Sequence, residues 1–282
     1  MQKVIVSIDG HCNIPNEIYE KFGIFSIPFE VVLDGKIYED TQNCIRMEDV
    51  VEAWERRGVF PQTAAISLGR YMDFFTSKTS EGYQIIHINL GSGGSACFNN
   101  CRLAINSLNL EKSVFQFDSQ NISFGLLILA IHAVELVGKY NDIPTVLSKL
   151  LEYRELLKSS YYISRLDFLS HGGRLINIQE TPSKDSYYEI IIQDNKTRFK
   201  AQFEDDLRQA LAKIIKNKFN NLAYNKKYVF VDTSMFSSKD ILQIKELLQR
   251  YNFENIFVTN ATCSCAGHWG PKALGIYFEV EH

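Results

Sequence analysis

The sequence lacks an excess of charge of either sign. Its 282 residues contain 30 Lys and Arg against 33 Asp and Glu, a formal net charge of −3 at pH 7, and the two signs are interspersed. We therefore expect neither a basic face for nucleic acid nor a polybasic membrane patch. A long hydrophobic run is also lacking, because the longest, Phe124–Gly138, contains His132 and Glu135 and is too short to cross a bilayer. Met1–Ser7 has no feature of a secretory signal, so we expect a cytoplasmic protein without an integral membrane segment.

Cysteine occurs at six positions only, and their spacing is not that of a zinc knuckle. Cys263 and Cys265 are separated by one residue, and disulfides are rare in a cytosolic chain. We expect small buried thiols and no metal or other cofactor. One alternative stays open, a metal site built from the following residues: Cys97, Cys101, Cys263, Cys265 and His268.

Apolar residues make up 45% of the chain, and 19 Phe and 14 Tyr supply ample material to line an apolar interior. Strand and helix patterns alternate in the first part, which predicts a mostly parallel sheet with helices on both faces. The later part begins with a hairpin pattern and predicts a smaller α/β domain. We place the boundary near residue 160, which gives an N-terminal α/β domain, 1–160, and a C-terminal α/β domain, 161–282.

We predict the individual helices and strands from the spacing of apolar residues and from the glycines and prolines that end each pattern. We expect strands at Lys3–Ser7, Ile24–Leu33, Lys36–Tyr38, Tyr83–Leu90, Ser113–Phe117, Tyr188–Ile192, Thr197–Phe203, Tyr228–Asp232, Asn255–Val258 and Leu274–Val280. We expect helices at Met47–Arg57, Ser67–Thr76, Ala96–Leu108, Phe124–Tyr140, Ile143–Leu157, Asp205–Lys216 and Ser238–Arg250.

Three short polar segments interrupt this apolar background. Pro61–Ala65 leads into a helix that Ser67 caps. Gly91–Ser95 joins a strand to a helix, and three glycines there allow backbone amides and the hydroxyls of Ser92 and Ser95 to approach an anion. The segment has neither the phosphate-loop nor the GxGxxG spacing. His268 is flanked by glycines and a proline, which predicts a loop position.

Together these segments resemble the DegV family of bacterial fatty-acid-binding proteins. Six matches occur in order along nearly the whole chain: Val4–Pro15, Pro61–Tyr71, Gly91–Asn100, Phe117–Ser119, Leu166–Arg174 and Gly267–Gly275. The most specific is LDFLSHGGR at Leu166–Arg174, which is similar to the family's Leu-x-x-Leu-x-x-Gly-Gly-Arg.

The resemblance implies two α/β domains with an acyl chain buried between them and no chemistry performed by the chain itself. It implies that Thr63, Ser92 and His268 hold the fatty acid carboxylate. Supporting ligand contacts fall on the glycine-rich segment: Gly93, Gly94 and Ser95. It further implies that the protein can act with a separate ATP-dependent fatty acid kinase, which forms an acyl phosphate for phospholipid synthesis. Arg174 is assigned to the domain surface or a protein partner.

Two other functions stay open at this point. A stand-alone hydrolase of acyl esters would use Ser92 or Ser95 with His268, although the Gly-x-Ser-x-Gly elbow is lacking and no acidic residue is identifiable as orienting the histidine. A diverged member would bind another small apolar ligand, because Ile176–Tyr188 is polar where the family has an apolar helix that covers the acyl chain.

Overall fold

The computed structural model describes residues 3–41, 45–173, 186–193, 196–204, 207–220 and 222–281. The chain divides into two compact units, one formed by Met1–Cys44 with Thr63–Glu155 and the other by Ile45–Gln62 with Leu156–His282. The sequence pattern does not predict that Ile45–Gln62 belongs to the second unit. Among the described residues, no helix combines the length and apolar character that a membrane span requires.

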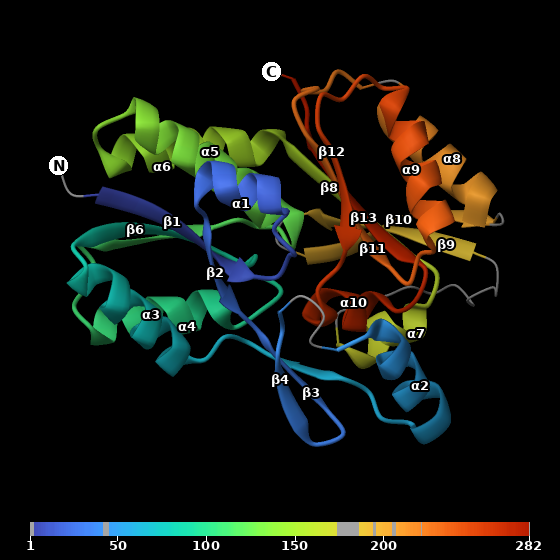
Figure 1. The fold of residues 1–282 in the computed structure, drawn as a ribbon, viewed down its shortest axis with the longest axis horizontal. Helices are drawn as coiled ribbons and strands as arrows, with labels where there is room; N and C mark the ends of the chain where they lie inside the picture. The colour runs from blue at the N-terminus through green and yellow to red at the C-terminus, as the bar shows by residue number, and fades with distance from the viewer. Residues whose placement is uncertain are drawn as a thin grey trace. The chain divides into compact units, whose positions relative to one another are not determined.

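The first unit is built on a four-stranded, fully parallel sheet in the order β2-β1-β6-β7 (Figure 1). Its strands are β1 (Lys3–Gly10), β2 (Phe25–Pro28), β6 (Tyr83–Asn89) and β7 (Val114–Asp118). The last five residues of both β1 and β6 are buried, as expected for central strands that are covered on both faces. The predicted parallel sheet is confirmed.

Helices cover both faces of this sheet (Figure 1). They are α1 (Asn16–Phe22), α3 (Leu68–Ser80), α4 (Cys97–Ser107), α5 (Phe124–Lys139) and α6 (Ile143–Leu156). α5 packs on β1 and β6 from one side, whereas α3 packs on β6 and α4 on β6 and β7 from the other. Eleven of the sixteen residues of α5 are buried, which explains why its sequence is apolar on nearly every side.

A small sheet, β4-β3-β5, accompanies the first unit. Its strands are β3 (Glu30–Leu33), β4 (Lys36–Glu39) and β5 (Gln62–Ala64). The turn between β3 and β4 has positive φ at Asp34 (52°) and Gly35 (74°), the geometry that an Asp-Gly hairpin favours. The predicted hairpin is therefore confirmed, and β5 is an additional strand that carries Thr63.

The second unit contains a six-stranded mixed sheet in the order β10-β9-β8-β13-β11-β12. Its strands are β8 (Leu157–Ile163), β9 (Ser186–Gln193), β10 (Lys196–Glu204), β11 (Val229–Ser234), β12 (Ile256–Asn260) and β13 (Ala273–Glu279). All neighbouring strands are antiparallel except β11 and β12. An apolar core that includes Ile214, Val231 and Ile276 lies between this sheet and two helices, α8 (Leu207–Phe219) and α9 (Ser238–Gln249).

Three further helices of the second unit pack on one another: α2 (Met47–Arg57), α7 (Leu166–His171) and α10 (Cys263–Trp269). The structure corrects the predicted loop position of His268, because this residue lies inside α10. The helix starts when the amides of Cys265 and Ala266 donate to the Thr262 carbonyl at 3.1 and 2.8 Å. Every residue of α10 except His268 is buried, so tertiary packing outweighs the low helix propensity of glycine.

Candidate functional site

The carboxyl ends of β1 and β6 mark the candidate site of the first unit. The chain places β2 on one side of β1 and then β6 and β7 on the other side, so the order in which strands are added to the sheet reverses between β1 and β6. In open α/β sheets, ligands bind beyond the carboxyl ends of the strands at such a topological switch point. The glycine-rich segment Gly91–Ser95 follows β6 directly at this edge.

The backbone of Gly91–Ser95 forms a tight turn in front of α4. The Gly94 amide donates to the Gly91 carbonyl at 3.0 Å, and the Gly91 amide donates to the Asn121 carbonyl at 2.9 Å. A Cβ at Gly91 would lie 3.1 Å from the backbone nitrogen of Asn121, so this position has little room for a side chain. Ser92, Gly93 and Gly94 are exposed, which leaves part of this turn accessible to an anion at the N-terminal end of α4.

Ser92 is held by Asp118 at the end of β7. Its hydroxyl donates to Asp118 Oδ2 at 2.6 Å, and its amide donates to Oδ1 at 3.1 Å. The same Oδ1 accepts from the Gln120 amide at 3.0 Å. The carboxylate of Asp118 therefore ties the glycine-rich turn to the neighbouring strand end, with the charge-assisted strength of an ionised acceptor.

Ser95 precedes Ala96, the N-cap residue of α4, and binds the first amide of the helix. Its Oγ accepts from the Cys97 amide at 3.2 Å and lies 3.1 Å from Cys97 Sγ. Burial, followed by the nearby Asp9 carboxylate, raises the pKa of the Cys97 thiol to about 12, so the thiol is neutral and unreactive at physiological pH. Ser95 thus has a structural role in the turn, and its contact with a ligand stays a prediction.

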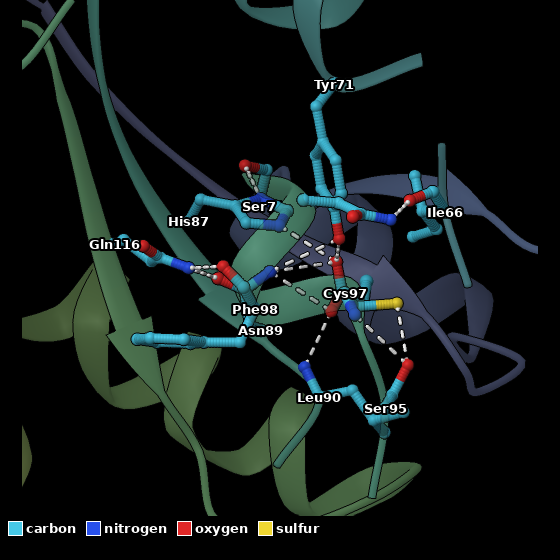
Figure 2. A network of polar contacts seen from close by, with 12 residues as sticks. Ser7, Ile66, Tyr71, His87, Asn89, Leu90, Ser95, Cys97, Phe98 and Gln116 are labelled. Carbon is cyan, nitrogen blue, oxygen red and sulfur yellow. Dashed lines mark hydrogen bonds and ion pairs between the residues drawn. The ribbon is translucent and has the colours of Figure 1, made fainter. Parts of the chain in front are cut away.

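A network of polar contacts lies beside the turn and includes Ser7, Tyr71, His87 and Asn89 (Figure 2). Its fully buried side chains centre on Asp9 of β1. Asp9 Oδ1 accepts from Tyr71 Oη at 2.6 Å and lies 3.0 Å from His87 Nε2. The side-chain amide of Asn89 donates to both carboxylate oxygens, at 3.3 and 3.2 Å, and the backbone amide of Leu90 donates to Oδ2 at 2.7 Å. Because Leu90 immediately precedes the glycine-rich turn, Asp9 fixes the point at which the turn leaves the sheet.

The same network contains serine, histidine and aspartate in the order of a hydrolase triad. Ser7 Oγ lies 2.8 Å from His87 Nδ1, and His87 Nε2 faces Asp9. All three side chains are 0% exposed, so no substrate can reach Ser7. The arrangement is structural. Its signal in the sequence is the pair of polar residues two apart on each apolar strand, Ser7 and Asp9 on β1, His87 and Asn89 on β6.

Thr63 belongs to the first unit as well. It lies half-buried on β5, the strand beside β3 in the small sheet. Ser67 caps α3 as expected, because its Oγ accepts from the Arg70 amide at 3.3 Å. Thr63 and the glycine-rich turn are thus contributed by one unit.

His268 is carried by the second unit, on α10. Its ring is only partly exposed and lies directly against Gly172 at the end of α7. Pro61 packs beside Gly267, because a Cβ on this glycine would lie 3.3 Å from Pro61 Cγ. Two segments that resemble family motifs, the one that begins at Pro61 and the one that contains Gly172, therefore both contact α10, at Gly267 and at His268. Arg174 itself lies outside the described residues, as does most of the polar segment Ile176–Tyr188.

Polar contacts join α2 to α7. Trp54 Nε1 donates to Asp167 Oδ2 at 3.2 Å, and Arg165 forms two hydrogen bonds to the same carboxylate, at 2.9 and 2.7 Å. Burial alone would raise the pKa of Asp167, but the hydrogen bonds from Arg165 and Trp54 lower it below its ordinary value. Arg165 also reaches Glu55 at 2.8 Å, so this carboxylate and guanidinium pair connects the two helices.

No group of three or more His, Cys, Asp and Glu side chains in the described part of the chain is arranged to hold a metal ion. Of the residues considered for such a site, Cys97 and Cys101 are buried in α4, and Cys263 and Cys265 are buried in α10.

The model of the DegV family, whose description is "uncharacterised protein, DegV family", matches residues 3–281. The chain belongs to the DegV family. Among DegV domain-containing proteins, one from Clostridium acetobutylicum is 27% identical over 286 residues and one from Clostridium perfringens is 25% identical over 282 residues. The alignments cover 99% and 100%, respectively, of both chains.

Solved DegV structures share the fold along the whole chain. A fatty-acid-binding DegV protein from Thermus thermophilus superposes with a TM-score of 0.84 at 18% identity, covering 99% of this chain and 100% of the other. A Thermotoga maritima protein with fatty acid binding function gives 0.82 at 21%, and Bacillus subtilis DegV, a fatty acid binding protein, gives 0.80 at 18%, each with 100% of both chains covered. The predicted two-domain α/β DegV fold is therefore confirmed.

Proposed function

We propose that this DegV protein binds a long-chain fatty acid in an apolar tunnel and performs no chemistry on it. The observation that carries the proposal is the exposed turn Ser92–Gly94 at the switch point of the parallel sheet, in a chain whose fold is that of fatty-acid-binding DegV proteins. A carboxylate suits this turn because backbone amides at the start of a helix favour an anion.

In this proposal the carboxylate is held by Thr63, Ser92 and His268, with Ser95 and the amides of Gly93 and Gly94 in support. Ser92 donates its hydroxyl to Asp118 in the structure and would redirect it to the ligand on binding. A histidine contributes a hydrogen bond when neutral and offsets the ligand charge when protonated. Several weak donors are needed, because a carboxylate cannot be buried without partners.

The acyl chain supplies the larger part of the binding free energy. Moving a sixteen-carbon chain from water into an apolar tunnel is favourable by roughly 12 kcal/mol, at about 0.8 kcal/mol for each buried methylene. Lost translational and rotational freedom costs about 4–15 kcal/mol, so the head-group contacts decide whether binding is tight. This balance makes the polar residues testable one at a time.

We further propose that the bound fatty acid is presented to a separate ATP-dependent fatty acid kinase. The support is the exposed position of the turn, which leaves the proposed head group near the surface. The protein alone should then leave ATP, fatty acids and acyl esters unchanged, and acyl phosphate should form only after a kinase is added. Ester turnover that is lost in His268→Ala would instead support a hydrolase.

The direct test is titration of delipidated protein with palmitate and oleate. Thr63→Ala, Ser92→Ala and His268→Ala should each weaken binding by about ten- to 150-fold, the loss expected for one hydrogen bond to a charged group. Thr76→Ala and Ser107→Ala are matched controls on exposed faces of α3 and α4 and should bind like the wild type. Failure of the wild type to bind either acid would refute the proposed function.

A further inference from the structure

The two glycines that follow α7 differ in what their backbone requires. Gly173 has φ of +68°, a left-handed conformation that favours glycine. Gly172 has φ of −69° and ψ of −3°, which every L-residue adopts without strain. Since alanine at such a position restricts the unfolded chain and is usually stabilising, backbone conformation does not explain the glycine at 172.

Space around Gly172 does explain it. A Cβ built on Gly172 would lie 2.1 Å from Nδ1 of His268, 2.8 Å from Cε1 and 3.2 Å from Cγ. The imidazole therefore occupies the place of the missing side chain, with its buried Nδ1 next to Gly172 at the end of α7. No methyl group fits there while the ring keeps its position.

The helix that carries His268 is itself fixed. Gly270, which ends α10, lies so close to Phe168 that a Cβ would be 2.8 Å from the ring. The Gly270 carbonyl accepts from Ser234 Oγ at 2.7 Å, and Pro61 packs beside Gly267. The helix is fixed at Gly267 before the histidine and at Gly270 after it. A side chain at 172 would therefore displace the imidazole more readily than the helix.

We propose that Gly172 is a positioning residue that sets the orientation of the His268 ring. It seats the Nδ1 edge against α7 and directs the Nε2 edge to the carboxylate of the ligand. The role in binding rests on the proposed function of His268, whereas the seating of the ring does not. The glycine pair at the end of α7 thus has two separate purposes, ring placement at 172 and a left-handed backbone at 173.

The test is a double-mutant cycle of Gly172→Ala and His268→Ala, with Gly173→Ala as the matched control. In the wild-type background, Gly172→Ala should weaken palmitate binding roughly tenfold or more and lower Tm by roughly 2–4 °C or more. In the His268→Ala background, Gly172→Ala should change neither binding nor Tm unfavourably. Gly173→Ala should lower Tm equally in both backgrounds, because its strain is independent of the histidine.

A third readout follows the ring itself. The side-chain ¹⁵N shifts of His268 should change in Gly172→Ala and stay unchanged in Gly173→Ala. If the wild type binds no fatty acid, the proposed function fails while the coupling in Tm and the ¹⁵N shifts still decide the seating. Additive effects of Gly172→Ala and His268→Ala on Tm, with unaltered ¹⁵N shifts, would overturn the inference even when palmitate binds.

Discussion

The buried network behind the glycine-rich turn makes a quantitative prediction for Tyr71→Phe. Tyr71 Oη donates to Asp9 Oδ1 at 2.6 Å and lies 3.3 Å from the Asn89 amide nitrogen, and all three side chains are 0% exposed. Burial and the adjacent Asp9 carboxylate raise the pKa of Tyr71 well above its ordinary value, so the hydroxyl is a neutral donor at all physiological pH values. Removing it deletes one hydrogen bond to a charged acceptor.

Hydrogen bonds to charged groups contribute about 1.5–3 kcal/mol, and the ring of Phe refills almost all of the volume of Tyr. Asp9 keeps its contacts with His87, Asn89 and the Leu90 amide, so the protein should fold with a free energy of unfolding lowered by about 2 kcal/mol. The measurement is urea unfolding followed by circular dichroism, in which the midpoint should fall at an unchanged m-value.

Tyr251→Phe is the matched control. Its hydroxyl donates to Asn220 Oδ1 at 3.1 Å on the surface, where water replaces the lost partner. We expect a change of less than about 0.5 kcal/mol there. If Tyr71→Phe destabilises the protein no more than Tyr251→Phe, the reasoning that Asp9 anchors the turn through this network is refuted.

Three further perturbations test other parts of the account. The pKa of Asp167 in the folded protein is lowered below its ordinary value of 3.8, so its contribution to stability should be complete above pH 3.8 and lost as the pH falls through the folded pKa. The free energy of unfolding and Trp54 fluorescence, followed during acid titration, should show this dependence. Asp167→Asn should remove it. Asp118→Asn should strengthen palmitate binding by roughly fivefold, because it removes a negative charge beside the Ser92 hydroxyl; equal or weaker binding in titration would contradict this. Cys97 and Cys101 should stay unlabelled by iodoacetamide at about pH 8 in the folded protein and react after denaturation, as peptide mass spectrometry would reveal; burial raises the pKa of both thiols.

Much of the fold follows from local pattern. α2 spans Met47–Arg57 as predicted, because its apolar spacing and the glycine after it specify both ends. The Asp34-Gly35 hairpin and the strand Tyr83–Asn89 follow from equally local signals. Such elements are predictable because the residues that define them are neighbours in the chain.

The elements that the sequence pattern misses depend on distant partners. α10 contains a glycine and no regular apolar period, and it is stable as a helix because α2 and α7 pack against it. β8 is missing from the predicted strands, and only its first residue, Leu157, falls in a predicted helix; it pairs with β9 and β13, which lie later in the chain. A strand of this kind is stabilised by pairing with segments that come later in the sequence, so its own residues show only a weak strand pattern.

The candidate site divides in the same way. The exposed turn at Ser92–Gly94 is visible in the sequence as a cluster of glycines after a strand. The polar residues of the buried network are visible as interruptions of two apolar strands, but their contacts with Asp9 are not, because β1, β6 and α3 are brought together only by the fold. The reason for Gly172 is equally non-local, since the atoms that exclude a side chain belong to His268, which is distant in the sequence.

The most direct test of the proposed function is native mass spectrometry of the purified recombinant protein, followed by denaturation and identification of the released small molecules. The account predicts one long-chain fatty acid per chain in the wild type, with occupancy reduced in His268→Ala and Ser92→Ala and retained in Thr76→Ala. A protein that carries no lipid and takes up neither palmitate nor oleate when they are added would contradict it, and the DegV fold would then serve a different ligand in this chain.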